Sequence, residues 1–340
     1  MTETTVSPTS PKRSAGSLLS TFFQSRYAGA LISLFLISLF LAIYQPVFLT
    51  WPNLMNIVKS NSVAFILALG ATYVVISGTV DLSFGSATTA SAIAFGLLFV
   101  SGIPLPFAIL GAITAGCLLG AINGYLVAYA NISYFVVTLG TLSVFQSVAL
   151  IANEGGSISV FSQPGFMALN RFVNGNVGPI PTILIFDAVL FFIASAVLRY
   201  TSFGRALYSI GSNTEAARLN GINVRRVLLT VFIISSLTAG LASVIQVGRL
   251  TVASPEVDMN LLLTVLAAVL IGGTAMTGGE GGVLGTLIGV LFLGVVQNGL
   301  TLSGVSSFWQ GTLSGGILIF SVWLGGVRGM LRSRQQAKLK

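Results

Sequence analysis

The sequence has few charged residues, one cysteine and no histidine. Charged residues make up 7% of its 340 positions and hydrophobic residues 54%, whereas a typical soluble domain is about 25% charged. Together with a mean hydropathy of +0.94, this excludes an ordinary soluble domain and indicates a polytopic membrane protein. The missing histidine removes the commonest metal ligand and general base, and the lone Cys117 excludes an intrachain disulfide or a cysteine metal cluster. We therefore expect neither catalysis nor a metal site in this chain.

Basic residues are also unevenly distributed. The net charge of +8 comes mostly from lysine and arginine near the N-terminus, in 199–226 and near the C-terminus. Short basic segments beside apolar spans stay on the cytoplasmic side of a membrane and attract anionic lipid. We interpret the charge as a set of topology signals at a lipid bilayer, and we expect no nucleic-acid partner.

Hydropathy and turn residues together predict an all-α protein with about ten membrane spans. An even number places both basic ends in the cytoplasm. We expect a disordered cytoplasmic tail at 1–28, a membrane domain at 29–327 and a basic cytoplasmic tail at 328–340. The first span is too long for the apolar core of a signal peptide, and a turn is expected after it at 51–53. The ten spans are 29–49, 60–77, 84–101, 105–129, 134–152, 182–199, 227–247, 260–274, 283–300 and 309–327.

The stretch 199–226 lies between two apolar blocks and holds six of the 24 charged residues. Ser212 and Glu215 have the spacing of a capping box at a helix start. Gly221 is expected to end that helix in a left-handed conformation. A helix of about eight residues is too short to be stable alone in water. We predict that it docks on another protein; the alternative is that 199–226 is only a basic anchor for the topology.

A first break in the helical pattern is predicted at 75–86, around Asp81. A carboxylate near hydrocarbon costs roughly 2.5–3.5 kcal/mol, so Asp81 must be hydrated, paired or capping a helix. Three roles remain open: a cap on the amides of Ser83 and Phe84, a contact to solute hydroxyls, or a sensor of events on the cytoplasmic side. The residues expected to form this break are Ser77, Gly78, Asp81, Ser83 and Gly85.

A second break is predicted at 271–283, where glycines beginning with Gly272 and Gly273 are too dense for a stable helix. We expect a cytoplasmic re-entrant turn or a hinge. A phosphate-binding loop is rejected because no Gly-Lys-Ser/Thr follows and no strand precedes. Asn123 and Asn298 lie in otherwise apolar spans, so each needs a partner within the bundle or a water-lined path.

Two polar loops are expected on the outer side, at 153–181 and around 249–258. Each residue in them is most simply a connector. As a pair, the loops form a polar surface that faces the other compartment.

Four motifs resemble those of ABC-importer permeases of the ribose type, and the resemblance covers about 40–327. The stretch beginning at Gly204-Arg205 is similar to the family pattern "FGR…AIG.N..AAR..GI". The first break is similar to "SGGIDLSVG", and the second to "IGGTS…GG.G…GT". The run Tyr134–Thr141, which includes Thr138, is similar to "PPFIVTLGT". The chain departs from these patterns at Thr79, in place of the second glycine, at Ser133-Tyr134, and at Glu280, where the family often has a basic residue.

The resemblance implies a cobalamin-importer-like (type II) fold with broken helices, in the bacterial inner membrane. It implies a short cytoplasmic helix that inserts into a cleft of a partner ATPase, which is expected to be a tandem polypeptide that binds ATP and Mg. It also implies a substrate-binding protein, either periplasmic or a lipoprotein, and a second permease copy or paralogue. No cofactor is expected on this chain. The implied coupling residues are Gly204, Arg205, Ser212, Glu215, Ala216, Ala217, Arg218 and Gly221.

The implied cargo is a small sugar, with a nucleoside, an autoinducer-like molecule or a branched-chain amino acid as alternatives. An ion-driven carrier would need ionisable residues within the membrane, and Asp81 is nearly the only candidate. An integral-membrane enzyme would need clustered acids, histidine or cysteine, which the sequence lacks. We therefore expect a non-catalytic permease subunit.

Overall fold

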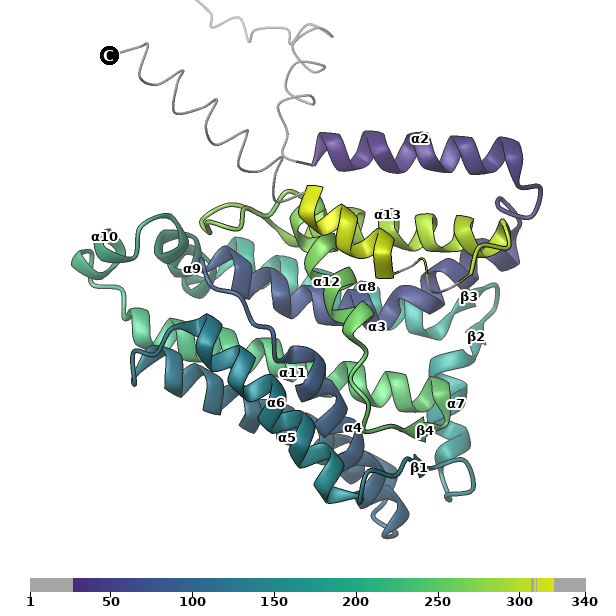
Figure 1. The fold of residues 1–340 in the computed structure, drawn as a ribbon, viewed down its shortest axis with the longest axis horizontal. Coiled ribbons are helices and arrows are strands. Elements are labelled where there is room, and N and C mark those ends of the chain that lie inside the picture. Colours follow the sequence, from purple (N-terminus) through teal and green to yellow (C-terminus); the bar gives the residue numbers. More distant parts are fainter. Residues whose placement is uncertain (1–26, 307–308, 310, 321–340) are drawn as a thin grey trace, which may run out of the picture.

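The computed structural model describes residues 27–306, 309 and 311–320. Nearly all of the expected tail 1–28, and all of 328–340, lie outside these residues. Within them the protein is helical, with four strands of two residues each. Most helices lie roughly parallel to one another and run across the view of Figure 1.

Ten apolar helices overlap the ten expected spans in order, so the all-α polytopic prediction is confirmed. The number of segments that cross the membrane and the type II fold stay predictions. Six helices are long and apolar enough to span a bilayer: α3 (Trp51–Ile76), α5 (Leu105–Ala128), α6 (Tyr134–Ala152), α8 (Thr182–Tyr200), α11 (Val224–Leu250) and α13 (Val283–Leu302). The shorter four are α2 (Ala28–Tyr44), α4 (Phe84–Val100), α12 (Met259–Ile271) and the helix Gly311–Phe320.

The turn expected at 51–53 is wrong, because α3 already begins at Trp51. Pro52 occupies its first turn, where the missing proline N–H has no helical acceptor to lose. The second span is therefore nine residues longer at its start than the sequence indicated, since hydropathy does not detect the polar first turns of a helix.

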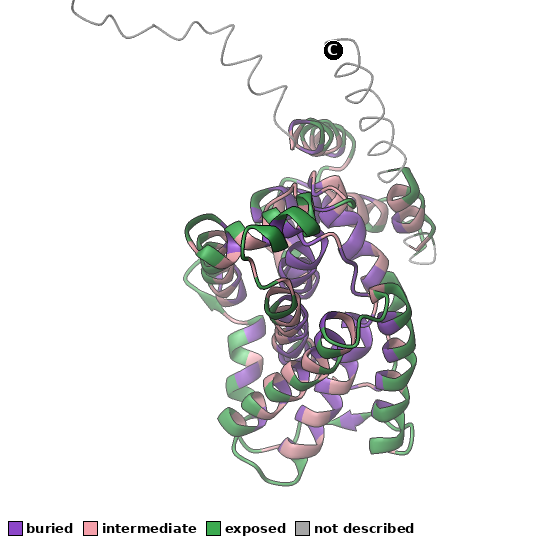
Figure 2. Ribbon diagram, turned by 90° about the vertical axis from the view of Figure 1, so that its left-hand side faces the viewer, coloured by how far each residue is buried: buried purple, intermediate pink, exposed green. Residues whose placement is uncertain are grey.

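The core follows α3 and α11. Figure 2 looks along the helices and shows buried residues in the centre of the bundle and exposed ones around it. Residues 61–76 of α3 are all buried. By contrast, α2, α5, α6 and α8 carry large exposed apolar side chains, among them Phe35, Phe107, Ile151 and Phe192. This is the pattern of a protein whose outer surface meets lipid rather than water.

The two ends of the bundle differ in structure (Figure 1). At one end, here called the α10 end, lie α9 (Ser202–Ser212) and α10 (Thr214–Leu219). At the other, the α7 end, lie α7 (Phe166–Asn174) and the strands. Of these, β1 (Ile158–Ser159) pairs with β4 (Val252–Ala253), and β2 (Asn176–Val177) pairs with β3 (Ile180–Pro181), both antiparallel. The two loops that the sequence placed on one side are thus joined by a strand pair.

Candidate coupling and translocation sites

The charged stretch 199–226 contains two helices rather than one. The sequence reasoning missed α9, although Gly204, Leu207 and Ile210 are spaced as one helical face and are all buried. Thr201 caps α9, since its Oγ1 accepts a hydrogen bond from the Gly204 N–H at 3.1 Å. Arg205 is exposed on the opposite face. Because α9 packs against the bundle, it gives the shorter α10 a fixed base.

The capping box predicted for α10 is wrong by one residue. Ser212 is the last residue of α9, and Asn213 caps α10 by accepting the Ala216 N–H on Oδ1 at 2.9 Å. Glu215 does not reach back to the cap; it forms an exposed ion pair with Arg218 at 2.9 Å. Asparagine caps a helix as well as serine does, so the local sequence offered both Ser212 and Asn213 as the N-cap of α10. Asn213 is the cap because its backbone is extended, whereas Ser212 is still part of α9.

The left-handed conformation predicted for Gly221 is present, with φ of +81°. The Gly221 N–H donates to the Arg218 carbonyl and the Ile222 N–H to the Ala217 carbonyl. These two bonds are the Schellman arrangement that ends a helix. Both ends of α10 are therefore stabilised by bonds within the chain.

The surface of α10 differs from the expected one at a single residue. Ala217 is 3% exposed and packs inward, so its predicted place on the docking face is wrong. Ala216 and Arg218 are exposed as expected, and Leu219 is 80% exposed. An apolar side chain that projects from a charged segment, with no covering residue in the described chain, is a candidate contact for a partner.

Behind α10, the backbones of three segments meet without intervening side chains. The Gly279 N–H donates to the Ile76 carbonyl at 2.8 Å. A Cβ on Gly278 would lie 2.6 Å from the Cα of Gly78 and 3.0 Å from that of Gly211. A Cβ on Gly211 would collide with the Ile76 carbonyl oxygen and the Gly279 nitrogen. We call Gly78, Gly211, Gly278 and Gly279 the glycine junction.

The glycine junction connects the charged stretch to both breaks. Gly211 lies near the end of α9, Gly78 at the start of the first break, and Gly278 and Gly279 in the second. Tyr208 on α9 adds a hydrogen bond from its hydroxyl to the Gly281 carbonyl at 2.9 Å. A displacement of α9 and α10 would therefore press directly on both breaks.

The second break, 272–282, is a non-helical turn between α12 and α13, as predicted. Gly272 follows the last residue of α12 and packs on the start of α13, where a Cβ would lie 2.7 Å from the Thr286 nitrogen. Gly273 has a φ of +88°. These contacts hold the turn against the bundle.

In the first break, Asp81 lies at the centre of a buried hydrogen-bond network. Its Oδ1 accepts the Ser83 N–H at 2.8 Å and the Ser83 hydroxyl at 2.6 Å, and its Oδ2 accepts the Ser235 hydroxyl of α11 at 2.9 Å. Asn123 of α5 donates to the Ser83 Oγ at 2.7 Å. All four residues of this Asp81 network are at most 2% exposed. The network therefore joins the start of α4 to α5 and α11.

The cap predicted for Asp81 is correct for only one of its two amides. Among the described hydrogen bonds, the carboxylate takes the Ser83 N–H and not that of Phe84; Ser83 itself is the cap residue of α4. Ser77 hydrogen-bonds to Val74 and Thr79 within the same turn. Asp81 is thus a tertiary connector as well as a local turn residue.

The remaining predicted residues do not form a single site. Asn298 exchanges two hydrogen bonds with Asn53 at the opposite end of α3 from the first break. Thr138 is fully buried on α6, and its Oγ1 has no partner among the described residues. Gly85 packs near Val257 and Leu262. Of the predicted polar positions Asn123, Thr138 and Asn298, only Asn123 joins the Asp81 network.

Sequence reasoning underestimated the acids within the membrane part. Asp187 of α8 is 6% exposed and accepts the Ser62 hydroxyl of α3 at 2.9 Å. It lies inside the span expected at 182–199, so counting acids within spans would have found it. Asp81 is therefore one of two buried carboxylates in the described bundle.

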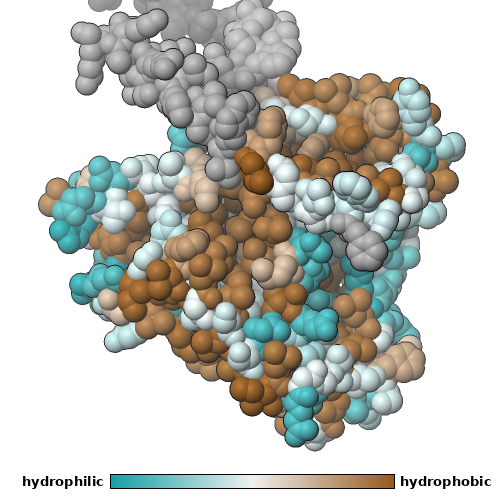
Figure 3. All heavy atoms as spheres, in the orientation of Figure 1, coloured by the Kyte–Doolittle hydropathy of each residue, from teal (hydrophilic) through white to brown (hydrophobic). Residues whose placement is uncertain are grey.

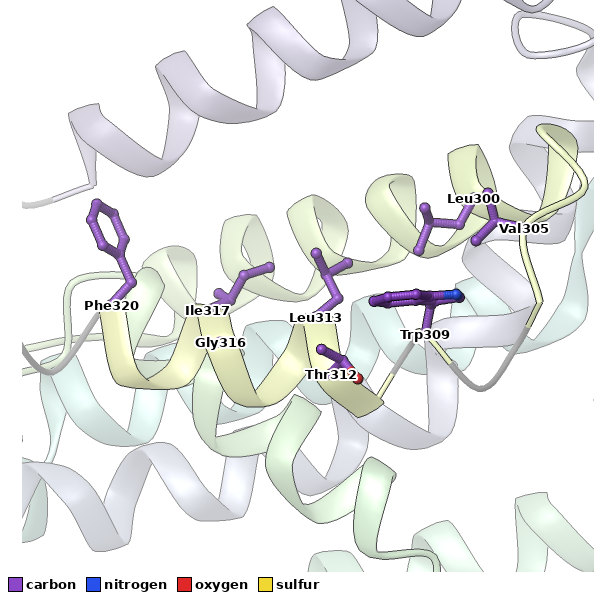
Figure 4. A pocket seen from close by; sticks show the side chains of 8 residues that line it. All are labelled: Leu300, Val305, Trp309, Thr312, Leu313, Gly316, Ile317 and Phe320. Carbon is purple, nitrogen blue, oxygen red and sulfur yellow. The ribbon is translucent and has the colours of Figure 1, made fainter.

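A groove of about 430 Å³ lies between α13 and the helix Gly311–Phe320, as Figure 4 shows. Among the described residues that line it, Thr312 supplies the only side-chain hydroxyl, and the others are apolar. A binding site for a hydrophilic solute needs several convergent polar groups. The groove therefore suits a hydrocarbon chain better than a hydrophilic solute. Its lining residues are Leu300, Val305, Trp309, Thr312, Leu313, Gly316, Ile317 and Phe320.

Apolar helices joined by two glycine-containing breaks, and a charged helical segment in contact with both breaks, define an integral membrane permease. Residues 53–322 match the family model described as the permease component of the branched-chain amino acid transport system. The chain belongs to this family. No solved structure matches it.

Curated relatives are similar over most of their length. The chain is 35% identical over 297 residues to "Ribose import permease protein RbsC" of Bacillus subtilis (strain 168), covering 87% of this chain and 91% of the relative. It is 32% identical over 306 residues to "D-allose transport system permease protein AlsC" of Escherichia coli (strain K12), covering 89% and 92%. It is 36% identical over 275 residues to "Autoinducer 2 import system permease protein LsrD" of Escherichia coli O9:H4 (strain HS), covering 80% and 82%.

Proposed function

We propose that this chain is the permease subunit of an ATP-driven importer for a small sugar. ATP is hydrolysed by a partner ATPase, expected as a tandem polypeptide, and the solute is delivered by an extracytoplasmic binding protein. A second permease copy or paralogue completes the pathway. The α10 end and both termini face the cytoplasm of a bacterial inner membrane, which agrees with the basic residues of 199–226. The ribose and allose permeases among the relatives support the choice of a sugar.

The observation that carries this proposal is that α9, on which α10 rests, contributes Gly211 to the glycine junction. The exposed face of α10, with Ala216, Arg218 and Leu219, is open to a partner. Its base, α9, contacts both breaks through the backbone of the glycine junction and through the hydrogen bond from Tyr208 to Gly281. Force applied by an ATPase to α10 would therefore pass through α9 to both breaks over short contacts, as the coupling of ATP hydrolysis to a pathway requires.

Leu219→Asp tests the docking face. The change places a charge where an apolar contact is expected, while α10 keeps its cap and its Schellman bonds. We expect the permease to remain in the membrane, and both ATPase co-purification and the ATP hydrolysis stimulated by the binding protein to fall about tenfold or more, the scale of a lost hot-spot residue.

The matched control is Leu250→Asp, because Leu250 is also exposed, at 55%, but lies on the last turn of α11 at the α7 end. It should leave ATPase attachment unchanged. If Leu219→Asp kept wild-type ATPase attachment and wild-type stimulation of ATP hydrolysis, 199–226 would be only a basic anchor for the topology.

A second cargo is favoured by the autoinducer-2 import permease among the relatives. Mass spectrometry of the ligand that co-purifies with the binding protein separates the two cases. A pentose or hexose supports the first proposal, and an autoinducer-like molecule replaces it with the second.

A further inference from the structure

The segment 254–258, between β4 and α12, descends from the α7 end into the bundle. A Cβ on Gly96 of α4 would lie 3.1 Å from the Cβ of Ala253, and a Cβ on Gly85 would lie 3.4 Å from Cγ1 of Val257. Gly96 and Gly85 are eleven residues apart on one helix, which is about 16 Å. The chain therefore reaches about the middle of a hydrocarbon core roughly 30 Å thick.

This descent explains why α12 is short. With 13 residues it is about 20 Å long and covers only the part of the membrane toward the α10 end. The extended segment supplies the rest of the span. We expected 249–258 on an outer rim; in the structure β4 (Val252–Ala253) lies at the α7 end, and the residues that follow lead inward.

One side of the segment is held by protein. Thr89 of α4 donates to the Glu256 carbonyl at 3.4 Å, and the Gln146 Nε2 of α6 donates to the Pro255 carbonyl at 2.8 Å. Asp258 caps α12, its Oδ1 accepting the N–H groups of Asn260 and Leu261 at 3.0 and 3.1 Å. Non-helical backbone at membrane depth persists only against protein or water, so the other side must meet one of these.

The other side carries polar side chains. Glu256, Asp258 and Asn260 are exposed, together with the apolar Met259, and neither carboxylate forms an ion pair with a basic residue in the described part of the chain. A charge facing lipid is costly at any depth in the core. Figure 3 shows hydrophilic atoms around a hollow on this face, in the region between α12 and β4. The open side therefore faces water.

An unpaired polar atom also belongs to this region. The Gln146 Oε1 is buried and has no hydrogen-bond partner among the described residues, although its Nε2 holds Pro255. A buried amide oxygen needs a donor, and a water molecule or a solute hydroxyl can supply one.

We propose that 254–258 and the first turn of α12 form one wall of the solute pathway, the acidic wall, and that Glu256, Asp258 and Asn260 contact the solute. Carboxylate and amide oxygens accept hydrogen bonds from hydroxyl groups. Two negative charges in a pathway flanked by apolar protein repel anions. The wall therefore fits a neutral polyhydroxylated solute and rejects its phosphorylated form. This proposal rests on the proposed transport function only for the identity of the solute.

Cysteine accessibility in the whole membrane complex tests the wall. In a Cys117→Ala background, the new thiol of Glu256→Cys should react with a small hydrophilic, membrane-impermeant thiol reagent. We expect this reaction in at least one of two states, the ATP-free and the ATP-trapped complex. Glu256 is chosen because its side chain caps no helix. The control is Val144→Cys on α6, which is 55% exposed and lies near the middle of a span, among other exposed apolar residues.

The thiolate is the reacting species and forms only in contact with water, so we expect Glu256→Cys to react about tenfold faster than Val144→Cys or more. If Glu256→Cys reacted no faster than Val144→Cys in either the ATP-free or the ATP-trapped state, the proposal would be overturned. Labelling does not depend on which solute is carried or on Leu219, so this result and the test of the proposed function can fail separately.

The specificity of the wall is tested by a paired Glu256→Gln and Asp258→Asn variant. Asparagine keeps the α12 cap, so assembly should be retained. We expect uptake of the neutral sugar to fall about tenfold, the scale of one or two lost charge-assisted hydrogen bonds. We also expect inhibition by the matching sugar phosphate to increase. Wild-type uptake with unchanged discrimination would show that the wall does not contact the solute.

Discussion

The starts of α4 and α12 use the same local device in two different surroundings. Each helix begins just after a non-helical segment with an aspartate, Asp81 before α4 and Asp258 before α12. The Asp81 carboxylate accepts one backbone N–H and that of Asp258 accepts two. Asp81 is 2% exposed and also bonded to Ser235 of α11. Asp258 is exposed, and within the described residues its carboxylate bonds only to the first turn of its own helix.

The difference shows that a helix start at membrane depth can be closed, with its aspartate buried among other helices, or open, with its aspartate exposed on one face. The Asp81 network ties three helices together in the interior of the bundle, so α4 begins at a fixed point. The start of α12 keeps one face toward water and has polar groups left for a solute. Two similar sequence patterns thus serve packing in one place and, in our proposal, transport in the other.

The largest expected effect is that of Asp81→Ala. It removes the acceptor of three buried donors, the Ser83 N–H, the Ser83 hydroxyl and the Ser235 hydroxyl. At about 1–3 kcal/mol for each unsatisfied group, the free energy of unfolding should fall by about 3 kcal/mol or more. Thermal unfolding in detergent measures it. Asp81→Asn keeps one acceptor oxygen, so its free energy of unfolding should lie between those of Asp81→Ala and the wild type. An Asp81→Ala protein as stable as the wild type would contradict the network.

Gly278→Ala tests the contact of the first break with the second. Gly278 has a φ of +83° and its Cβ would crowd the Gly78 backbone. Overpacking of this kind costs typically about 1–3 kcal/mol in addition to backbone strain. Gly304→Ala is the matched control, because its φ is +71° and no atom lies within 4 Å of a Cβ there.

We expect Gly278→Ala to be the less stable of the pair by thermal unfolding, and to lose the stimulation of ATP hydrolysis by the binding protein while keeping ATPase attachment. Gly304→Ala should keep both. Equal behaviour of the two variants would exclude a role for the junction beyond backbone conformation.

The smallest effect is expected for Asp258→Ala. It removes the α12 cap, worth about 1 kcal/mol, and leaves no buried donor behind because the site is open to water. In the same thermal unfolding measurement, Asp258→Ala should be clearly more stable than Asp81→Ala. A loss as large as that of Asp81→Ala would mean that the start of α12 is closed, and the contrast between the two helix starts would disappear.

The sequence alone determined the helical class, the ten apolar segments, both breaks and the left-handed Gly221. These properties depend on local composition. A run of apolar residues, a dense group of glycines or a glycine after a short helix acts through its own backbone and immediate neighbours. For the same reason, helix starts were the weakest part: α3 begins at Trp51 and Asn213 replaces Ser212 as a cap.

Only the tertiary structure decided which distant residues meet. The glycines of the junction come from three segments that are more than sixty residues apart in the sequence. Asp187 accepts a hydrogen bond from Ser62, which lies 125 positions away. The environments of Asp81 and Asp258 follow from helices packed against them, which no local pattern encodes. Hydropathy specifies how each segment sits in a bilayer, whereas the partner of a polar group depends on the packing of the whole bundle.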